Sequence, residues 1–275
     1  MNTLQNLHQH TAFCDGKDTT EQVVLAAIEK GFGAIGFSGH CYTPYDYPVC
    51  PEYCMSPEQT EQYRQEIQQL KDKYADWIEI YCGLEYDFAC PLKPEGFEYM
   101  IGSIHGLKIH GEDVEFDGSA EKFRHFIDQY FDGDGMDFAI TYFRQVATLP
   151  EYGDFDILGH FDLITKYRDR VDLFDTTAKQ YRFAAIEAAE ALAGKIPYFE
   201  VNTGAIARGY RTTPYPDPFI VKELKRLGFG AVISSDCHDA NQLDCGFDVA
   251  TQLLKDCGFE EKYILTKEGF RAVPL

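Results

Sequence analysis

Histidines and carboxylates occur at short, repeated spacings near both ends of this sequence. His8 and His10 are two residues apart, Asp15 follows shortly after, and Asp236 and His238 repeat the two-residue spacing. Because residues i and i+2 of an extended strand project from the same face, each pair places two metal-ligating side chains together. Mixed imidazole and carboxylate ligands suit zinc, manganese or iron, whereas a structural zinc site would be rich in thiolates. The pattern therefore predicts metal binding.

Secondary structure must bring such distant residues together. Short apolar runs alternate with helical patterns along the chain, which is typical of β/α units around a parallel sheet. Seven strands are predicted, at residues 4–8, 34–37, 78–84, 100–104, 156–159, 198–201 and 231–234. Helices are predicted over residues 19–30, from residue 56 onward, and over 119–131, 136–149, 175–193, 217–227 and 242–256. The first two helices begin with capping boxes, at Thr19 and at Ser56.

Seven β/α units without a glycine-rich nucleotide motif predict an α/β fold with a closed or nearly closed, TIM-like barrel, in preference to a doubly wound nucleotide-binding fold. No linker interrupts the sequence, so residues 1–275 are predicted to form a single domain. Catalytic residues of parallel barrels gather at the carboxyl ends of the strands. Six of the eight histidines fall at such predicted ends, whereas His110 and His125 are predicted to be surface residues. The residues at or just after the strand ends are His8, His10, Asp15, His40, Glu85, His105, His160, Asp236 and His238.

Nine candidate ligands exceed what one ion takes from a protein while keeping a position open for water. Two or three clustered divalent ions are therefore predicted. Glu85 is a candidate to bridge two of them, because a carboxylate has two oxygens. Glu200 is predicted to orient an imidazole from behind, as carboxylates do in other metal sites.

Composition argues against several other classes of protein. Forty-five acidic and 25 basic residues give a formal charge of −20, which disfavours nucleic acid or an anionic membrane surface as the main partner. Nine scattered cysteines in a chain that can form its own core predict reduced thiols and a cytoplasmic protein. No apolar run approaches the roughly 18 residues of a membrane span. The oligomeric state stays open.

Taken in order, the motifs at the strand ends resemble those of the PHP (polymerase and histidinol phosphatase) phosphoesterases, and among them the monofunctional histidinol-phosphatases. The resemblance runs from residue 7 to about residue 240. The motifs are His8-x-His10, Asp15-Gly16, Gly39-His40, Gly83-Leu84-Glu85, Gly102-Ser103-Ile104-His105, Gly159-His160-Phe161-Asp162, Asn202-Thr203 and Ser235-Asp236-x-His238.

The resemblance implies a trinuclear metal site in a distorted (β/α)7 barrel. The implied ligand sets are His8, His10, Glu85 and Asp236 for one ion, Asp15, His40 and His238 for a second, and Glu85, His105 and His160 for a third. It also implies hydrolysis of a small phosphorylated substrate, L-histidinol phosphate, with Glu85, Asp236 and His238 as catalytic residues. A water shared by two cations is acidified to a pKa of ~7, so hydroxide could attack phosphorus in line.

Cationic side chains are expected to bind the phosphate. Arg208 and Arg211 lie in a glycine-containing segment after the sixth strand and are the first candidates. Lys166 and Arg168 are second candidates, and Ser103 could donate one hydrogen bond.

Alternatives remain open from the sequence. A PHP phosphoesterase could act on another small phosphate or on a nucleotide, an amidohydrolase-type deaminase also begins with His-x-His, and a non-catalytic barrel is a further possibility. The tyrosine-rich loop 41–50 could form an aromatic wall for an imidazole, with its acidic residues facing an ammonium, or could pack on itself. The thiols of Cys41, Cys50 and Cys54 are expected to be unliganded.

Overall fold

The computed structural model describes residues 2–44, 53–93 and 95–275. Seven parallel strands form its sheet in the order β1-β2-β3-β4-β7-β8-β9. Their bounds are β1 Gln5–Asn6, β2 Ala34–Phe37, β3 Glu79–Asp87, β4 Tyr99–Ser103, β7 Ile157–Leu158, β8 Tyr198–Asn202 and β9 Gly230–Ser234. A parallel bridge between Gln9 and Cys237 joins the segments that follow β1 and β9, so the sheet is a nearly closed barrel. The predicted (β/α)7 barrel is confirmed.

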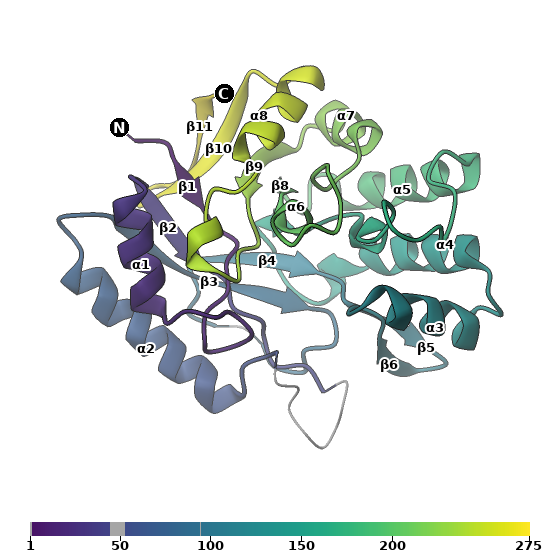
Figure 1. Ribbon diagram of the computed structural model, residues 1–275, viewed down its shortest axis with the longest axis horizontal. Helices are drawn as coiled ribbons and strands as arrows, with labels where there is room; N and C mark the ends of the chain where they lie inside the picture. The colour runs from purple at the N-terminus through teal and green to yellow at the C-terminus, as the bar shows by residue number, and fades with distance from the viewer. Residues whose placement is uncertain (1, 45–52, 94) are drawn as a thin grey trace.

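Helices surround the strands (Figure 1). Their bounds are α1 Thr20–Glu29, α2 Pro57–Lys73, α3 Ala120–Tyr130, α4 Gly135–Val146, α5 Lys179–Leu192, α6 Gly204–Ala207, α7 Pro218–Arg226 and α8 Phe247–Asp256. Both predicted capping boxes are present, at Thr19 and at Ser56. The last helix begins later than predicted, because a 3-10 turn at Ala240–Gln242 and Gly246 with φ of 75° precede it. Within the described part of the chain, no helix has the length and apolarity needed to cross a bilayer.

Two antiparallel hairpins were not predicted. One consists of β5 (Gly106–Ile109) and β6 (Glu112–Glu115), and the other of β10 (Glu261–Thr266) and β11 (Gly269–Pro274). In the first, His110 and Gly111 form the two-residue connection with φ of 52° and 91°, as a hairpin turn requires. The exposed His110 thus belongs to this turn, and His125 is also exposed, as predicted for both.

The barrel interior is filled by a core separate from the one between strands and helices. It contains Leu7, Ala34, Tyr81, Tyr99, Ile101, Ile157, Val232 and Leu265. The side-chain amide of Gln5 fixes the C-terminal hairpin to β1, since it donates to the Leu265 carbonyl (2.9 Å) and accepts from the Leu265 N–H (2.7 Å). The other end of the barrel is left for the polar residues described next.

Candidate metal centre

The structure brings all nine predicted ligands together at the carboxyl end of the barrel. Their donor atoms form three overlapping groups, each with ligand atoms within 4.8 Å of one another. These groups are His8, His10 and Asp236; His10, Asp15, His40 and His238; and His40, Glu85 and His105. The ninth residue, His160, places Nε2 3.0 Å from Glu85 Oε1 and 3.3 Å from His105 Nε2.

The innermost group is His8, His10 and Asp236. His8 and His10 come from the segment after β1 and are almost completely buried. Their Nε2 atoms lie 3.2 and 3.6 Å from Glu85 Oε2, yet these three buried atoms make no hydrogen bond. Buried polar atoms without partners are costly. Lone pairs that converge without bonding to one another are the arrangement that a divalent cation satisfies, so these residues fit a metal ion.

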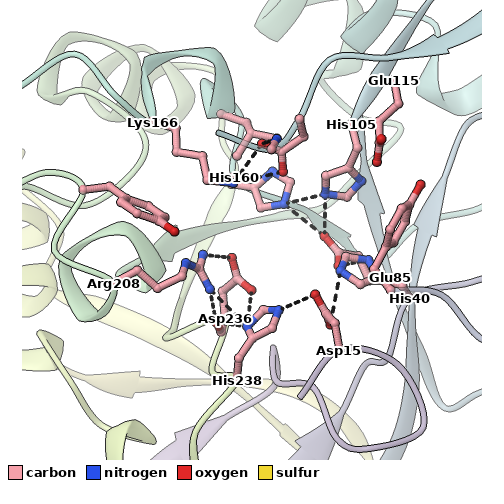
Figure 2. Close-up of a pocket in the computed structure, with 15 residues that line it drawn as sticks. Asp15, His40, Glu85, His105, Glu115, His160, Lys166, Arg208, Asp236 and His238 are labelled. Carbon is pink, nitrogen blue, oxygen red and sulfur yellow. Dashed lines mark hydrogen bonds and ion pairs between the residues drawn. The ribbon is translucent and has the colours of Figure 1, made fainter. Parts of the chain in front are cut away.

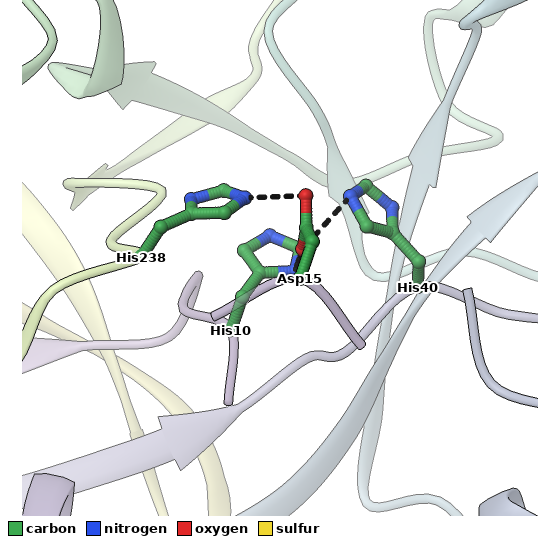
Figure 3. Close-up of side chains that lie close together, drawn as sticks. All are labelled: His10, Asp15, His40 and His238. Atoms are coloured by element: carbon green, nitrogen blue, oxygen red, sulfur yellow. Dashed lines mark hydrogen bonds and ion pairs between the residues drawn. The ribbon is translucent and has the colours of Figure 1, made fainter. Parts of the chain in front are cut away.

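The outermost group surrounds Asp15, as Figure 3 shows. Asp15 Oδ2 lies 3.1 Å from His238 Nε2, and Asp15 Oδ1 lies 3.5 Å from His10 Nδ1 and 3.8 Å from His40 Nε2. The neighbouring histidines hold the pKa of Asp15 well below its usual range, although burial opposes them. The carboxylate is therefore ionised, as a metal ligand must be.

Carboxylates behind the imidazoles determine which ring nitrogen is free to bind a cation. Glu200 Oε2 accepts from His8 Nδ1 (2.9 Å), which is the contact that the predicted orienting role of Glu200 requires. Asp87 Oδ2 lies 3.1 Å from His105 Nδ1 and also accepts from the His105 N–H (2.9 Å). Asp87 was not predicted, although it lies two residues after Glu85 in β3 and so on the same face.

His10 illustrates how burial prepares a ligand. Burial and the neighbouring His238 and His40 lower its pKa to about 3, so the ring is neutral and keeps a lone pair. Glu85 stays ionised, because His8 and His40 hold its pKa well below the usual range against the opposing effect of burial. The neutral His10 ring and the ionised Glu85 carboxylate are both donors that a divalent metal ion accepts.

Asp236 adopts a left-handed backbone conformation with φ of 46°, which is uncommon for a residue with a side chain. Arg208 holds it there, because its guanidinium donates to Asp236 Oδ2 (2.9 Å) and to the Asp236 carbonyl (2.9 Å). Arg208 also lies 3.0 Å from His238 Nδ1. Strained backbone of this kind gathers at functional sites.

A cavity of about 330 Å³ opens above the ligands (Figure 2). Seven of the nine predicted ligands line it, while His8 and His10 lie beneath its floor. Of the predicted phosphate-binding residues, Arg208 and Lys166 also line the cavity, and Lys166 Nζ pairs with both oxygens of Asp117 (2.8 and 3.1 Å). This cavity thus holds cationic side chains beside the candidate metal ligands.

The other three predicted phosphate-binding residues do not line this cavity. Arg211 is buried and donates to Thr165, Thr213, Pro214 and Asp217. Arg168 also pairs with Asp217, and Ser103 is 2% exposed beside Gly159, where a Cβ would lie 2.3 Å from Ser103 Oγ. Arg211 and Arg168 therefore bond to the surrounding loops, whereas the Ser103 hydroxyl is buried without a hydrogen-bond partner.

Several cavity residues were not predicted. Glu115, Asp117, Tyr53 and Tyr210 all line the cavity. Tyr45, Tyr47 and Cys50 of the loop 41–50 lie outside the described residues, and Tyr42 lines a different pocket. Within the described part of the chain, neither Cys41 nor Cys54 forms a disulfide, and the same holds for the other cysteines there.

Comparisons with known proteins agree with this geometry. The model of the PHP domain matches residues 6–204. Proteins named "Probable histidinol-phosphatase" match 94% of this chain: one from Schizosaccharomyces pombe is 26% identical over 284 residues, 89% of its own length. The other, from Deinococcus radiodurans, is 27% identical over 274 residues, 95% of its own length.

Among solved structures, the histidinol phosphate phosphatase from Lactococcus lactis, complexed with zinc, L-histidinol and phosphate, has the same fold. It superposes with a TM-score of 0.70 and 22% sequence identity, over 98% of this chain and all of that chain.

Proposed function

The chain belongs to the PHP family, and from this premise we propose that it is a metal-dependent phosphomonoesterase that hydrolyses L-histidinol phosphate to L-histidinol and phosphate. The names of the two relatives support the substrate, as do the ligands of the Lactococcus lactis enzyme. We treat residues 1–275 as one functional unit, because the C-terminal hairpin is bonded to β1.

One observation carries the proposal: three overlapping groups of metal-ligating atoms line or underlie a single cavity that also contains Arg208 and Lys166. Divalent ions supply Lewis acidity and lower the pKa of water, which is the chemistry that phosphate ester hydrolysis needs. We propose Glu85, Asp236 and His238 as the residues nearest to the reacting phosphorus. Glu85 lies in β3, Asp236 and His238 both follow β9, and all three line the cavity.

The remaining side chains position the proposed metal ligands and supply positive charge for the phosphate. The Arg208 side chain lines the cavity and is 24% exposed, and its guanidinium contacts Asp236 and His238, so it can bind a phosphoryl oxygen while it positions two proposed ligands. Lys166 supplies a second positive charge, which Asp117 holds in place. Glu200 and Asp87 keep His8 and His105 in the orientation that presents Nε2 to the centre.

Two or three zinc, manganese or iron ions are our proposal for the cofactor, because the donors are nitrogen and oxygen and no thiolate is among them. We also propose a cytoplasmic location, which the free thiols of the described residues support.

The test is phosphate release from L-histidinol phosphate, an aryl phosphate and a nucleotide, with metal content measured on the same sample. We expect the fastest turnover with L-histidinol phosphate and at least two divalent ions per chain. Comparably slow rates on all three substrates would overturn the substrate assignment, and a metal-free active enzyme would overturn the mechanism.

A further inference from the structure

Glu115 is a carboxylate in the cavity wall that belongs to none of the three metal-ligating groups. It is the last residue of β6, and its side chain is 15% exposed. Figure 2 shows it pointing into the cavity from the side of His105, whereas Lys166 and Arg208 reach the cavity from the opposite side. The cavity thus has a cationic wall and an acidic wall with the metal ligands between them.

The backbone fixes Glu115 relative to the metal site. Glu115 pairs with Gly106 in the β5–β6 hairpin, directly after the proposed ligand His105. The N–H groups of the next two residues, Phe116 and Asp117, both donate to the His105 carbonyl (3.1 and 3.2 Å). Phe116 is fully buried among the rings of Phe123, Phe126, Phe138 and Tyr142. A carboxylate held this firmly is suited to select one substrate group.

Glu115 accepts fewer hydrogen bonds than Asp117 and so retains more capacity for a ligand. Both Asp117 oxygens accept from Lys166, and Oδ1 also accepts from the Gly118 N–H. Glu115 pairs through Oε2 with Lys122, whose side chain is 42% exposed. Since a carboxylate can accept about four hydrogen bonds, the Glu115 carboxylate can accept a further donor from the cavity.

Tyr53 completes this wall. Its ring also lines the cavity and lies edge-on to His40, with the ring centroids 5.8 Å apart. Burial and, after it, the nearby Glu115 carboxylate raise the pKa of the Tyr53 hydroxyl, so the phenol stays neutral. An aromatic ring beside a carboxylate is a favourable environment for an organic cation.

We propose that Glu115 and Tyr53 form a leaving-group subsite that binds an ammonium, so that the enzyme selects phosphate monoesters of amino alcohols. The inference rests on the proposed function, because the phosphate must lie at the metal ligands for its alcohol to reach Glu115. Glu115 is then a specificity-determining residue, and substrates without a positive charge on the alcohol leave its carboxylate poorly satisfied.

The experiment compares matched substrates that differ only in the ammonium. One pair is L-histidinol phosphate and its deamino analogue, and the other is ethanolamine phosphate and ethyl phosphate. In the wild type we expect kcat/KM to favour the ammonium member of each pair by about 10- to 100-fold, the size of a charge-assisted hydrogen bond. In Glu115→Gln this ratio should fall close to one. Glu112→Gln, at the exposed end of the same strand, should keep the wild-type ratio.

Inhibition of the wild-type enzyme provides a second test that does not depend on whether a variant folds. L-Histidinol should inhibit hydrolysis of an aryl phosphate at concentrations at least about tenfold lower than its deamino analogue. Equal inhibition, no preference within either substrate pair, or an unchanged ratio in a folded, metal-loaded Glu115→Gln protein would each overturn the subsite.

The two proposals fail in different ways. If the wild type discriminates within the ethanolamine pair through Glu115 but turns over L-histidinol phosphate no faster than a nucleotide, the substrate assignment fails and the subsite stands. If L-histidinol phosphate is the preferred substrate but the ratio survives in Glu115→Gln, the subsite fails and the proposed function stands.

Discussion

Glu85 lies at the centre of five imidazoles. Its two oxygens lie between 2.9 and 3.6 Å from ring nitrogens of His8, His10, His40, His105 and His160. Four separate strand ends contribute these rings. A single carboxylate at this position can contact more than one ion, which is why a substitution there should affect the whole centre.

We expect Glu85→Gln to lower kcat/KM by more than about 100-fold and to reduce the metal bound per chain. Loss of a residue that only hydrogen-bonds to a metal ligand costs about 10- to 100-fold, and loss of a ligand itself should cost more. Activity assays with metal analysis of the purified protein test this. The control is Glu79→Gln at the opposite end of the same strand, where Glu79 accepts from Tyr81. Full metal content and wild-type turnover in Glu85→Gln would exclude a ligand role.

Glu200 acts through the groups it holds. It accepts from His8 Nδ1, from the His160 N–H and from the side chains of Asn202 and Ser234. Glu200→Gln replaces one acceptor oxygen by a donor, so buried donors lose their partner. Metal affinity should fall about 10- to 100-fold, measured by competition with a chelator, while excess metal should restore much of the activity.

Glu190→Gln serves as the matched control for that experiment, because Glu190 is 53% exposed and pairs with Arg226 on the surface. If Glu200→Gln and Glu190→Gln resist the chelator equally, Glu200 does not support the metal site.

At the scale of elements, Tyr99 of β4 explains how three strands approach one another inside the barrel. Its hydroxyl donates to the carbonyls of Leu7 (2.5 Å) and Phe37 (3.0 Å). Gly36 and Gly83 leave room for the ring, since a Cβ at Gly83 would lie 2.3 Å from Tyr99 Cζ and one at Gly36 2.5 Å from Tyr99 Oη. These glycines are therefore required by packing in the barrel interior.

Gly83→Ala should lower the free energy of unfolding by about 1–3 kcal/mol, because an overpacked interior forces the ring or the strand to shift. Urea denaturation measures the difference. At Gly153 the nearest atom to an added Cβ is 3.4 Å away, so Gly153→Ala should change stability by less than about 0.5 kcal/mol. Equal stabilities for the two variants would contradict this account of the interior.

For the molecule as a whole, the carboxylates gathered at this end of the barrel lower the stability of the folded state unless they are paired. Glu85, Asp87, Glu200 and Asp236 are all buried at one end of the barrel in a chain with a formal charge of −20. Buried charge is costly unless it is paired. Cations bound at this end would offset that cost in the folded state alone.

Removal of metal with a chelator should therefore lower the melting temperature, and added zinc or manganese should restore it. An ion at 100 times its dissociation constant stabilises the folded state by about 2.7 kcal/mol. Thermal melts with and without chelator test this, and Glu85→Gln should show a smaller shift than the wild type. A melting temperature that changes with neither chelator nor added metal would contradict stabilisation of the folded state by metal bound at this end of the barrel.

The barrel and the group of residues that gather at its carboxyl end could be predicted from the sequence. Strand ends in a parallel barrel meet at one rim, so residues such as His40 and His160 can be assigned to a common site from their place after a strand. The seven strands observed also disfavour the eight-stranded deaminase alternative.

Tertiary structure alone decided which arginine faces the cavity. Arg208 and Arg211 are three residues apart, but α6 ends at Ala207, and Gly209, with φ of 64°, turns the chain between the two arginines.

Arg208 therefore reaches Asp236, while Arg211 turns back to Asp217. The position of Glu115 in the cavity wall could not be predicted from the sequence either. Glu115 reaches the cavity through the β5–β6 hairpin, and the position of this hairpin depends on burial of Phe116 among aromatic rings from elsewhere in the chain. Local spacing specifies which residues follow a strand, and the direction of a loop side chain depends on packing against residues far away in the chain.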